Sequence, residues 1–92
     1  MQFLATISLD PTRRSEVERV LSEETARVRE LMQSGQMHAL YIPEGIGAPD
    51  SLWAVFSGDS HETVESVIES LPLYPYMRVE LTQLRSLESG RV

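Results

Sequence analysis

One glutamate lies where a helix is expected to be apolar. The apolar residues between positions 17 and 32 recur with the period of one helical face: Val17, Val20, Leu21, Val28, Leu31 and Met32. Glu24 lies in the middle of this face, seven residues after Val17 and four before Val28. Burial raises the pKa of a carboxyl group and makes it a better base near neutral pH, so Glu24 is a candidate general acid/base in a pocket between helix and sheet. The alternatives are a structural ion pair with Arg27 or Arg78, or a shallow position that water reaches.

Two tyrosines in the segment LPLYPYMRVEL, residues 71–81, form a second candidate group. Pro75 cannot donate a ladder hydrogen bond, so it belongs at the start or the edge of a strand. The pattern predicts a strand that begins with phenol side chains. Alternate residues of a strand share a face, so Tyr74 and Tyr76 are expected to point the same way and to bind a ligand carbonyl or carboxylate. The alternative is that both rings pack at the edge of the core with hydrated hydroxyls.

His38 is a third candidate, because histidine can relay protons near neutral pH. The alternation of its strand places it with Leu40 and Ile42, opposite Ala39 and Tyr41. The alternative is a structural histidine with satisfied hydrogen bonds. Two separated histidines, His38 and His61, are weak evidence for a metal, and no metal site is predicted.

Trp53, the only tryptophan, is expected in the core or in the wall of a pocket. Arg13, Arg14 and Arg19 are read as a solvated helix face. The loop glycines do not form a GxGxxG pattern, so no nucleotide site is predicted.

These residues must be positioned by six predicted elements. The alternation and the breakers predict strands over 2–9, 36–43 and 51–57, and a loop over 44–50. The capping residues predict a helix from Asp10-Pro11 to Ser34 with Gly35 as its stop, and a second helix capped by Asp59 with Glu62. Residues 71–84 supply the fourth strand, which begins with Tyr74 and Tyr76, and residues 85–92 form a C-terminal tail.

The order βαββαβ predicts a ferredoxin-like α+β fold, in which two helices cover one face of a four-stranded antiparallel sheet. We expect one domain over residues 1–84. The other face of the sheet is then uncovered, and Leu4, Leu40 and Ile42 are expected to make it partly apolar. A second copy packing sheet to sheet would cover it, so we expect a homodimer or a larger homo-oligomer.

Composition excludes several classes of function. The 92 residues carry a formal net charge of −6 and contain no lysine, which argues against nucleic acid or anionic membranes as partners and excludes lysine Schiff bases. No cysteine is present, so thiol chemistry is excluded and a cytoplasmic location is expected. Neither a signal peptide nor a span of about 20 apolar residues is recognised.

The segment LPLYPYM resembles the C-terminal signature Leu-Pro-Leu-Phe-Pro-Tyr-Met of muconolactone delta-isomerases, with Tyr74 in place of phenylalanine. The segments ELMQSG (30–35), AVF (54–56) and MQFLATISLD (1–10) are similar to other parts of these enzymes, so the resemblance covers about residues 1–84. It implies a dimeric α+β barrel, rings of dimers, and a cofactor-free proton shift on a five-membered lactone during catechol catabolism. The family's glutamate-lysine pair falls on Glu24 and Thr25. Its His-Leu-Trp-Arg run falls on residues 39–42, where Ala39 and Ile42 replace the polar side chains.

The first hypothesis is therefore an isomerase without a metal or organic cofactor that shifts a proton on a small lactone or related cyclic carbonyl compound. Glu24 would move the proton, with His38, Tyr74 or Tyr76 bonded to the enolate oxygen and Arg27 or Arg78 holding a substrate carboxylate. The second is a non-catalytic protein of the same scaffold that binds a small ligand or a partner. The third is a cyclase-like or monooxygenase-like enzyme acting on an aromatic polyketide-type substrate, with a pocket around Tyr41 and Trp53.

Overall fold

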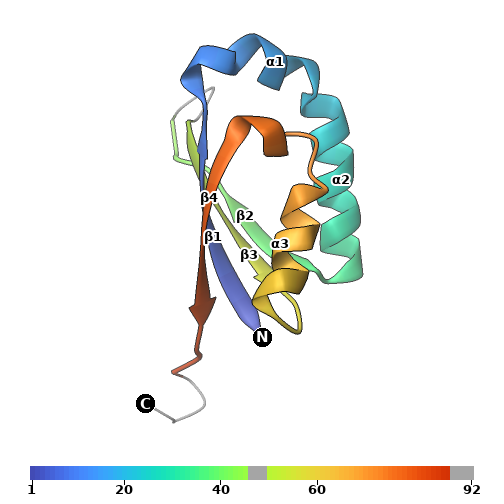
Figure 1. Cartoon of the computed structure of the whole chain (residues 1–92), viewed down its shortest axis with the longest axis vertical. Coiled ribbons are helices and arrows are strands. Elements are labelled where there is room, and N and C mark those ends of the chain that lie inside the picture. The colour runs from blue at the N-terminus through green and yellow to red at the C-terminus, as the bar shows by residue number, and fades with distance from the viewer. Residues whose placement is uncertain (46–49, 88–92) are drawn as a thin grey trace.

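The computed structural model describes residues 1–45 and 50–87 of the chain. Figure 1 shows one sheet with the helices packed on one of its faces. The elements are, in chain order, β1 (Gln2–Leu9), the 3₁₀ turn η1 (Pro11–Arg13), α1 (Arg14–Arg19), α2 (Leu21–Ser34), β2 (Met37–Tyr41), β3 (Ser51–Ser57), α3 (His61–Glu69), the 3₁₀ turn η2 (Tyr74–Tyr76) and β4 (Met77–Leu84). Part of the predicted loop over 44–50 and part of the predicted tail over 85–92 lie outside the described residues.

The four strands form one sheet in the order β2-β3-β1-β4, and every neighbouring pair is antiparallel. This confirms the predicted ferredoxin-like α+β fold. On the central strands Phe3 lies opposite Phe56 and Ala5 opposite Ala54, and all four side chains are buried on the face beneath the helices. The alternation predicted for residues 2–9 is therefore the alternation between the two faces of the sheet.

The first helical region begins as predicted but is divided in two. The Asp10 carboxylate accepts a hydrogen bond from the Thr12 N–H at 2.9 Å, and Pro11 occupies the first position of η1. The predicted single helix is wrong at Val20, where φ is −106° and ψ is 7°. This break lets α1 cross the end of the sheet while α2 runs along it (Figure 1). Gly35, with φ 82°, ends α2 as predicted.

The cap predicted for α3 is wrong by one residue. Ser60 is extended, with φ −155°, and its hydroxyl accepts the Thr63 N–H at 3.1 Å. Asp59 and Ser60 are both favoured capping residues, and the Glu62 that suggested a capping box beginning at Asp59 lies in the first turn of the helix without that role.

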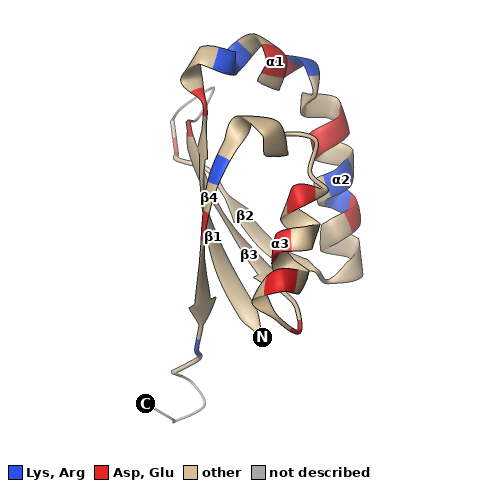
Figure 2. Cartoon of the chain, viewed as in Figure 1, with Lys and Arg blue, Asp and Glu red and all other residues tan. Residues whose placement is uncertain are grey.

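The core lies between the helices and the covered face of the sheet. Its buried residues come from all of the strands except β4 and from both longer helices: Phe3, Ala5, Ile7, Leu31, Met37, Ala54, Phe56, Val64, Ile68 and Leu71. Charged side chains gather on the helices, and β1, β2 and β3 carry none (Figure 2). The apolar core therefore holds the helices against one face of the sheet.

Candidate active site

A cavity of about 520 Å³ lies between the sheet and the α1–α2 region. It opens at the end of the sheet where β1 and β2 finish and β3 and β4 begin. Within its lining we distinguish two groups, an inner wall of buried residues together with the partly buried Glu24, and a mouth of exposed residues. The inner wall comprises Glu24, Ala54, Phe56, Leu71 and Leu73. The mouth comprises Asp10, Arg14, Glu18, Leu21 and Asp50.

Glu24 lies on the inner wall, as the helical periodicity predicted, because α2 turns this position toward the sheet. Its Oε1 accepts a hydrogen bond from the Leu73 N–H at 2.9 Å. Burial raises the pKa of the Glu24 carboxyl above its ordinary value, and the hydrogen bond from Leu73 partly opposes that rise. The site thus holds a carboxyl group whose proton affinity is increased by an apolar environment.

The ion pairs proposed as alternatives for Glu24 do not form within the described residues. Arg27 donates from Nε and Nη2 to the Ser70 hydroxyl, at 3.2 and 2.9 Å, and so ties α2 to the end of α3. Arg78 is exposed on β4 opposite Ser8, on the uncovered face of the sheet. Neither arginine lines the cavity, so the structure does not place them where a ligand in it would be bound.

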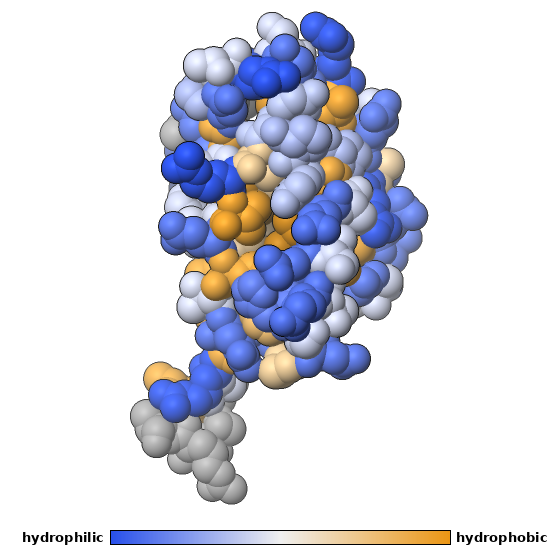
Figure 3. All heavy atoms as spheres, in the orientation of Figure 1, coloured by the Kyte–Doolittle hydropathy of each residue, from blue (hydrophilic) through white to orange (hydrophobic). Residues whose placement is uncertain are grey.

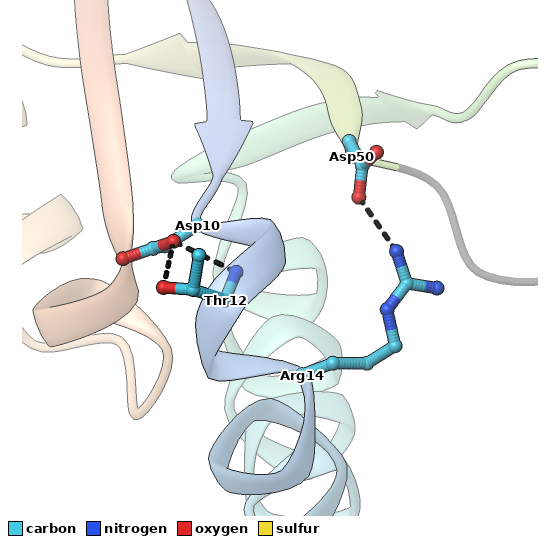
Figure 4. Close-up of polar contacts among 4 residues, drawn as sticks. All are labelled: Asp10, Thr12, Arg14 and Asp50. Atoms are coloured by element: carbon cyan, nitrogen blue, oxygen red, sulfur yellow. Dashed lines mark hydrogen bonds and ion pairs between the residues drawn. The ribbon is translucent and has the colours of Figure 1, made fainter.

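The mouth of the cavity carries an ion pair that the sequence analysis missed. Arg14 Nη2 lies 3.1 Å from Asp50 Oδ1, so α1 is linked to the residue before β3 (Figure 4). Asp10 is held as the cap of η1 by the N–H and hydroxyl of Thr12, and these hydrogen bonds lower the pKa of its carboxyl. Of these mouth residues, the sequence indicated only Asp10, through the Asp10-Pro11 cap that begins the helical region at the end of β1.

Tyr74 and Tyr76 do not share a face of a strand, and that prediction is wrong. Both belong to the 3₁₀ turn η2, where the Tyr76 N–H bonds to the Leu73 carbonyl at 2.9 Å. Two residues apart in a turn with three residues per turn point in different directions. The guanidinium of Arg13 lies 5.2 Å from the centre of the Tyr76 ring, and neither tyrosine lines the larger cavity.

Tyr74 instead lines a smaller cavity of about 210 Å³ between α3 and β4. Figure 3 shows apolar side chains at the surface between these two elements, bordered by polar ones. His61 and Glu65, whose side chains lie 3.1 Å apart, line the same cavity. The LPLYPYM segment therefore contributes to both cavities: Leu71 and Leu73 line the inner wall of the larger one, and Tyr74 lines the smaller one.

The faces predicted for the second strand are wrong because β2 contains a bulge between Met37 and Ala39. The extra residue reverses the alternation, so Leu40 lies on the covered side of the sheet and lines the larger cavity, as Ile42 does just after the strand. Neither forms the uncovered face. His38 Nε2 lies 2.5 Å from the Ser57 hydroxyl and does not line either cavity.

Tyr41 and Trp53 lie across from each other on the uncovered face of the sheet. Leu4 and Val55 form a second apolar pair on the same face. Tyr41 is 60% exposed, and neither aromatic residue lines either cavity of a single chain. The pocket expected around Tyr41 and Trp53 is therefore not formed by one chain.

Metal ligands do not gather in the described part of the chain, since no group of three or more His, Cys, Asp or Glu side chains has the arrangement that holds a metal ion. Over the same residues, no helix has the length and apolar character needed to cross a bilayer.

Comparison with known proteins agrees with this architecture. The family model described as muconolactone delta-isomerase matches residues 1–89. The chain belongs to the muconolactone delta-isomerase family. A relative with this activity in its name, Muconolactone Delta-isomerase from Cupriavidus pinatubonensis, is 29% identical over 65 residues, which cover 71% of this chain and 67% of that protein.

Two solved structures share the fold. The 5-chloro-2-hydroxyhydroquinone dehydrochlorinase of Burkholderia phenoliruptrix, in complex with 2,5-dihydroxybenzoquinone, aligns with a TM-score of 0.75 at 14% identity, covering 92% of this chain and 94% of that one. A crystal structure of muconolactone isomerase aligns with a TM-score of 0.71 at 23% identity, covering 91% and 88%. The family match over residues 1–89 confirms the resemblance that the sequence showed over about residues 1–84.

Proposed function

We propose that this protein is an isomerase that moves a proton on a small lactone or related cyclic carbonyl compound, with Glu24 as the acid/base. The observation that carries the proposal is the Glu24 carboxyl on the inner wall of a largely apolar cavity, with its pKa raised by burial. A base works best when its pKa lies near the working pH, so an apolar wall improves a glutamate for this task.

The reaction needs one proton to leave one carbon and to return to another. Glu24 would remove the proton from a saturated ring carbon attached to a C=C bond that is conjugated with the lactone carbonyl. The electrons of the broken C–H bond would delocalise through the C=C bond onto the carbonyl oxygen as a dienolate. The protonated Glu24 would then return the proton to a different carbon of the same conjugated system. Because Oε1 is held by the Leu73 N–H, the other carboxylate oxygen is the one that would carry the proton. No electron enters or leaves, so this chemistry requires no redox cofactor.

The assembly that we propose is a homodimer or a larger homo-oligomer built through the uncovered face of the sheet. Leu4, Tyr41, Trp53 and Val55 make this face partly apolar, and an apolar sheet face without helices needs a cover. His38, Tyr74 and Tyr76 do not line the larger cavity of one chain, so a hydrogen bond from any of them to the enolate would require another copy. The compartment that we propose remains the cytoplasm.

Proton NMR of muconolactone incubated with the protein in deuterated water tests the activity. We expect conversion to the enol-lactone, or deuterium uptake beside the carbonyl, at a rate that depends on protein concentration. Glu24→Gln keeps the size of the side chain and removes the base, so exchange should fall by about 10² to 10⁴-fold. Glu23→Gln, the neighbouring exposed position on α2, is the matched control and should keep full activity. Full activity in Glu24→Gln would contradict the role of Glu24.

A non-catalytic ligand-binding role is the second candidate, and two cavity residues favour it. Thr25 and Ile42 line the cavity where the resemblance implies a lysine and an arginine. The Thr25 hydroxyl is already bonded to the Leu21 carbonyl at 2.8 Å. This role predicts thermal stabilisation by lactones without exchange, equally in the parent protein and in Glu24→Gln. The third candidate, a polyketide-type cyclase or monooxygenase, loses its basis in one chain because Tyr41 and Trp53 lie outside the cavity.

A further inference from the structure

The charges around the larger cavity are strongly unbalanced. Four carboxylates line it, from Asp10, Glu18, Glu24 and Asp50, and among the described lining residues Arg14 is the one cation. The imbalance has the same sign as the formal net charge of −6 on the whole chain.

The single cation is already engaged. Arg14 Nη2 is 3.1 Å from Asp50 Oδ1, and Figure 4 shows its side chain extending away from Asp10 toward Asp50. The Leu9 N–H donates to the Asp50 carbonyl at 2.7 Å, so the backbone of Asp50 is fixed beside the end of β1. A ligand carboxylate would have to compete with Asp50 for Arg14.

The rest of the described lining offers no charged alternative. Val28, Leu40, Ile42 and Leu52 present apolar side chains to the cavity, and the Thr25 hydroxyl donates to the backbone of its own helix. A carboxylate moved into such surroundings loses its hydration without gaining a partner. At an effective dielectric constant of about 20, repulsion between two carboxylates that lie within about 10 Å of each other weakens binding by more than about tenfold.

We infer that the substrate or ligand of this cavity is an uncharged cyclic carbonyl compound, rather than a carboxylate-bearing lactone. This inference rests on the proposed function, because it names the substrate class of the same cavity. It concerns binding as well as turnover, so it can be tested even where proton transfer fails.

The test compares muconolactone with its primary amide, which has the same ring and nearly the same shape but no charge at pH 7. Dissociation constants come from NMR titration of the labelled protein, and kcat/KM comes from deuterium exchange on the same samples. We expect the amide to bind, and to exchange, at least about tenfold better than the acid, which corresponds to about 1.4 kcal/mol. Raising the salt concentration should improve binding of the acid and leave that of the amide unchanged, because salt screens like-charge repulsion.

Asp50→Asn provides the matched variant, because it removes one carboxylate and releases Arg14. It should improve binding of the acid several-fold while changing binding of the amide by less than about twofold. Arg19→Gln, an exposed arginine of α1 that does not line the cavity, is the control and should leave the ratio unchanged.

Equal or tighter binding of the acid would overturn the inference and leave the proton transfer by Glu24 standing. Failure of the proposed function would look different. Tighter binding of the amide, with no exchange on either compound, would support the preference for an uncharged ligand and contradict the proposed isomerase.

Discussion

The inner wall and the mouth of the cavity hold carboxyl groups whose pKa values are shifted in opposite directions. Glu24 on the inner wall has a raised pKa, because burial disfavours its charge more than the single Leu73 N–H favours it. Asp10 at the mouth has a lowered pKa, because the hydroxyl and N–H of Thr12 both donate to its carboxylate, and solvent surrounds it. The same chemical group thus has its pKa raised at one end of the cavity and lowered at the other.

The difference shows that the surroundings of a carboxyl group, rather than its residue type, determine the direction in which its pKa is shifted. A helical glutamate becomes a base because α2 turns it toward buried leucines. An aspartate of nearly the same intrinsic acidity becomes a helix cap and a fixed negative charge because it follows the last residue of β1. Three predictions follow from this contrast, beyond the tests of activity and of ligand charge given above.

The largest expected effect comes from truncating a leucine at each end. Leu71 on the inner wall is 4% exposed, and Leu21 at the mouth is 46% exposed. Leu71→Ala should lower the free energy of unfolding by about 2–5 kcal/mol, because it leaves a void in the core. Leu21→Ala should lower it by no more than about 0.5 kcal/mol. Urea denaturation of both variants gives the comparison.

Equal losses of unfolding free energy in Leu71→Ala and Leu21→Ala would contradict the difference in burial between the inner wall and the mouth. They would mean that Leu21 is buried in solution, as it would be if another copy covered the mouth. Repeating the measurement over a range of protein concentrations would identify that case, because stability that depends on association depends on concentration.

The dependence of stability on pH should have opposite signs for the two carboxyl groups. The folded-state pKa of Glu24 is raised, so the stability that it contributes is present below the unfolded value of 4.5 and is lost as the pH rises through the folded pKa. The folded-state pKa of Asp10 is lowered, so its contribution is present above the unfolded value of 3.8 and is lost as the pH falls through the folded pKa.

Urea denaturation between pH 3 and pH 7 would measure these signs in Glu24→Gln and Asp10→Asn. Relative to the parent protein, Glu24→Gln should become more stable as the pH rises, and Asp10→Asn should become less stable. Each shift should be smaller than the loss in Leu71→Ala. Slopes of the same sign in both variants would show that the two carboxyl groups do not differ as described.

The features that the sequence predicted correctly are those that local rules determine. The alternation over residues 2–9 places Phe3 and Ala5 in the core, Gly35 ends α2, and the helical period turns Glu24 inward. Each of these depends on neighbours within one or two helical turns, or on the two-residue repeat of a strand. The fold then follows, because six such elements in this order have few ways to bury their apolar faces.

The features that were missed depend on contacts between distant segments or on one extra residue. The bulge beside His38 inserts a residue into β2 and reverses the side on which Leu40 lies, and no glycine at that position signals it. The pair formed by Arg14 and Asp50 joins residues 36 positions apart, which the period of a single helix cannot reveal. Tyr74 and Tyr76 lie in a turn closed by the Leu71 and Leu73 carbonyls, while the Leu73 N–H bonds to Glu24, a partner 49 residues away in the sequence.

The smallest expected effect concerns the ion pair at the mouth. The side chains of Arg14 and Asp50 are 48% and 58% exposed, so water screens their attraction. A double-mutant cycle with Arg14→Gln and Asp50→Asn should give a coupling free energy of about 0.2–1 kcal/mol that decreases with added salt. The exposed pair of Arg13 and Glu16, at 3.4 Å on adjoining turns, is the matched control and should give a similar value.

A coupling free energy above about 2 kcal/mol would instead indicate that the mouth is shielded from water, as the inner wall is. That result would remove the electrostatic difference between the two ends of the cavity. A small coupling free energy would mean that the pair of Arg14 and Asp50 contributes little to stability, because solvent stabilises each charge separately. Asp50 can then be replaced at almost no cost to the fold, and any change that follows in the preference between charged and uncharged lactones reports on the charge of the mouth alone.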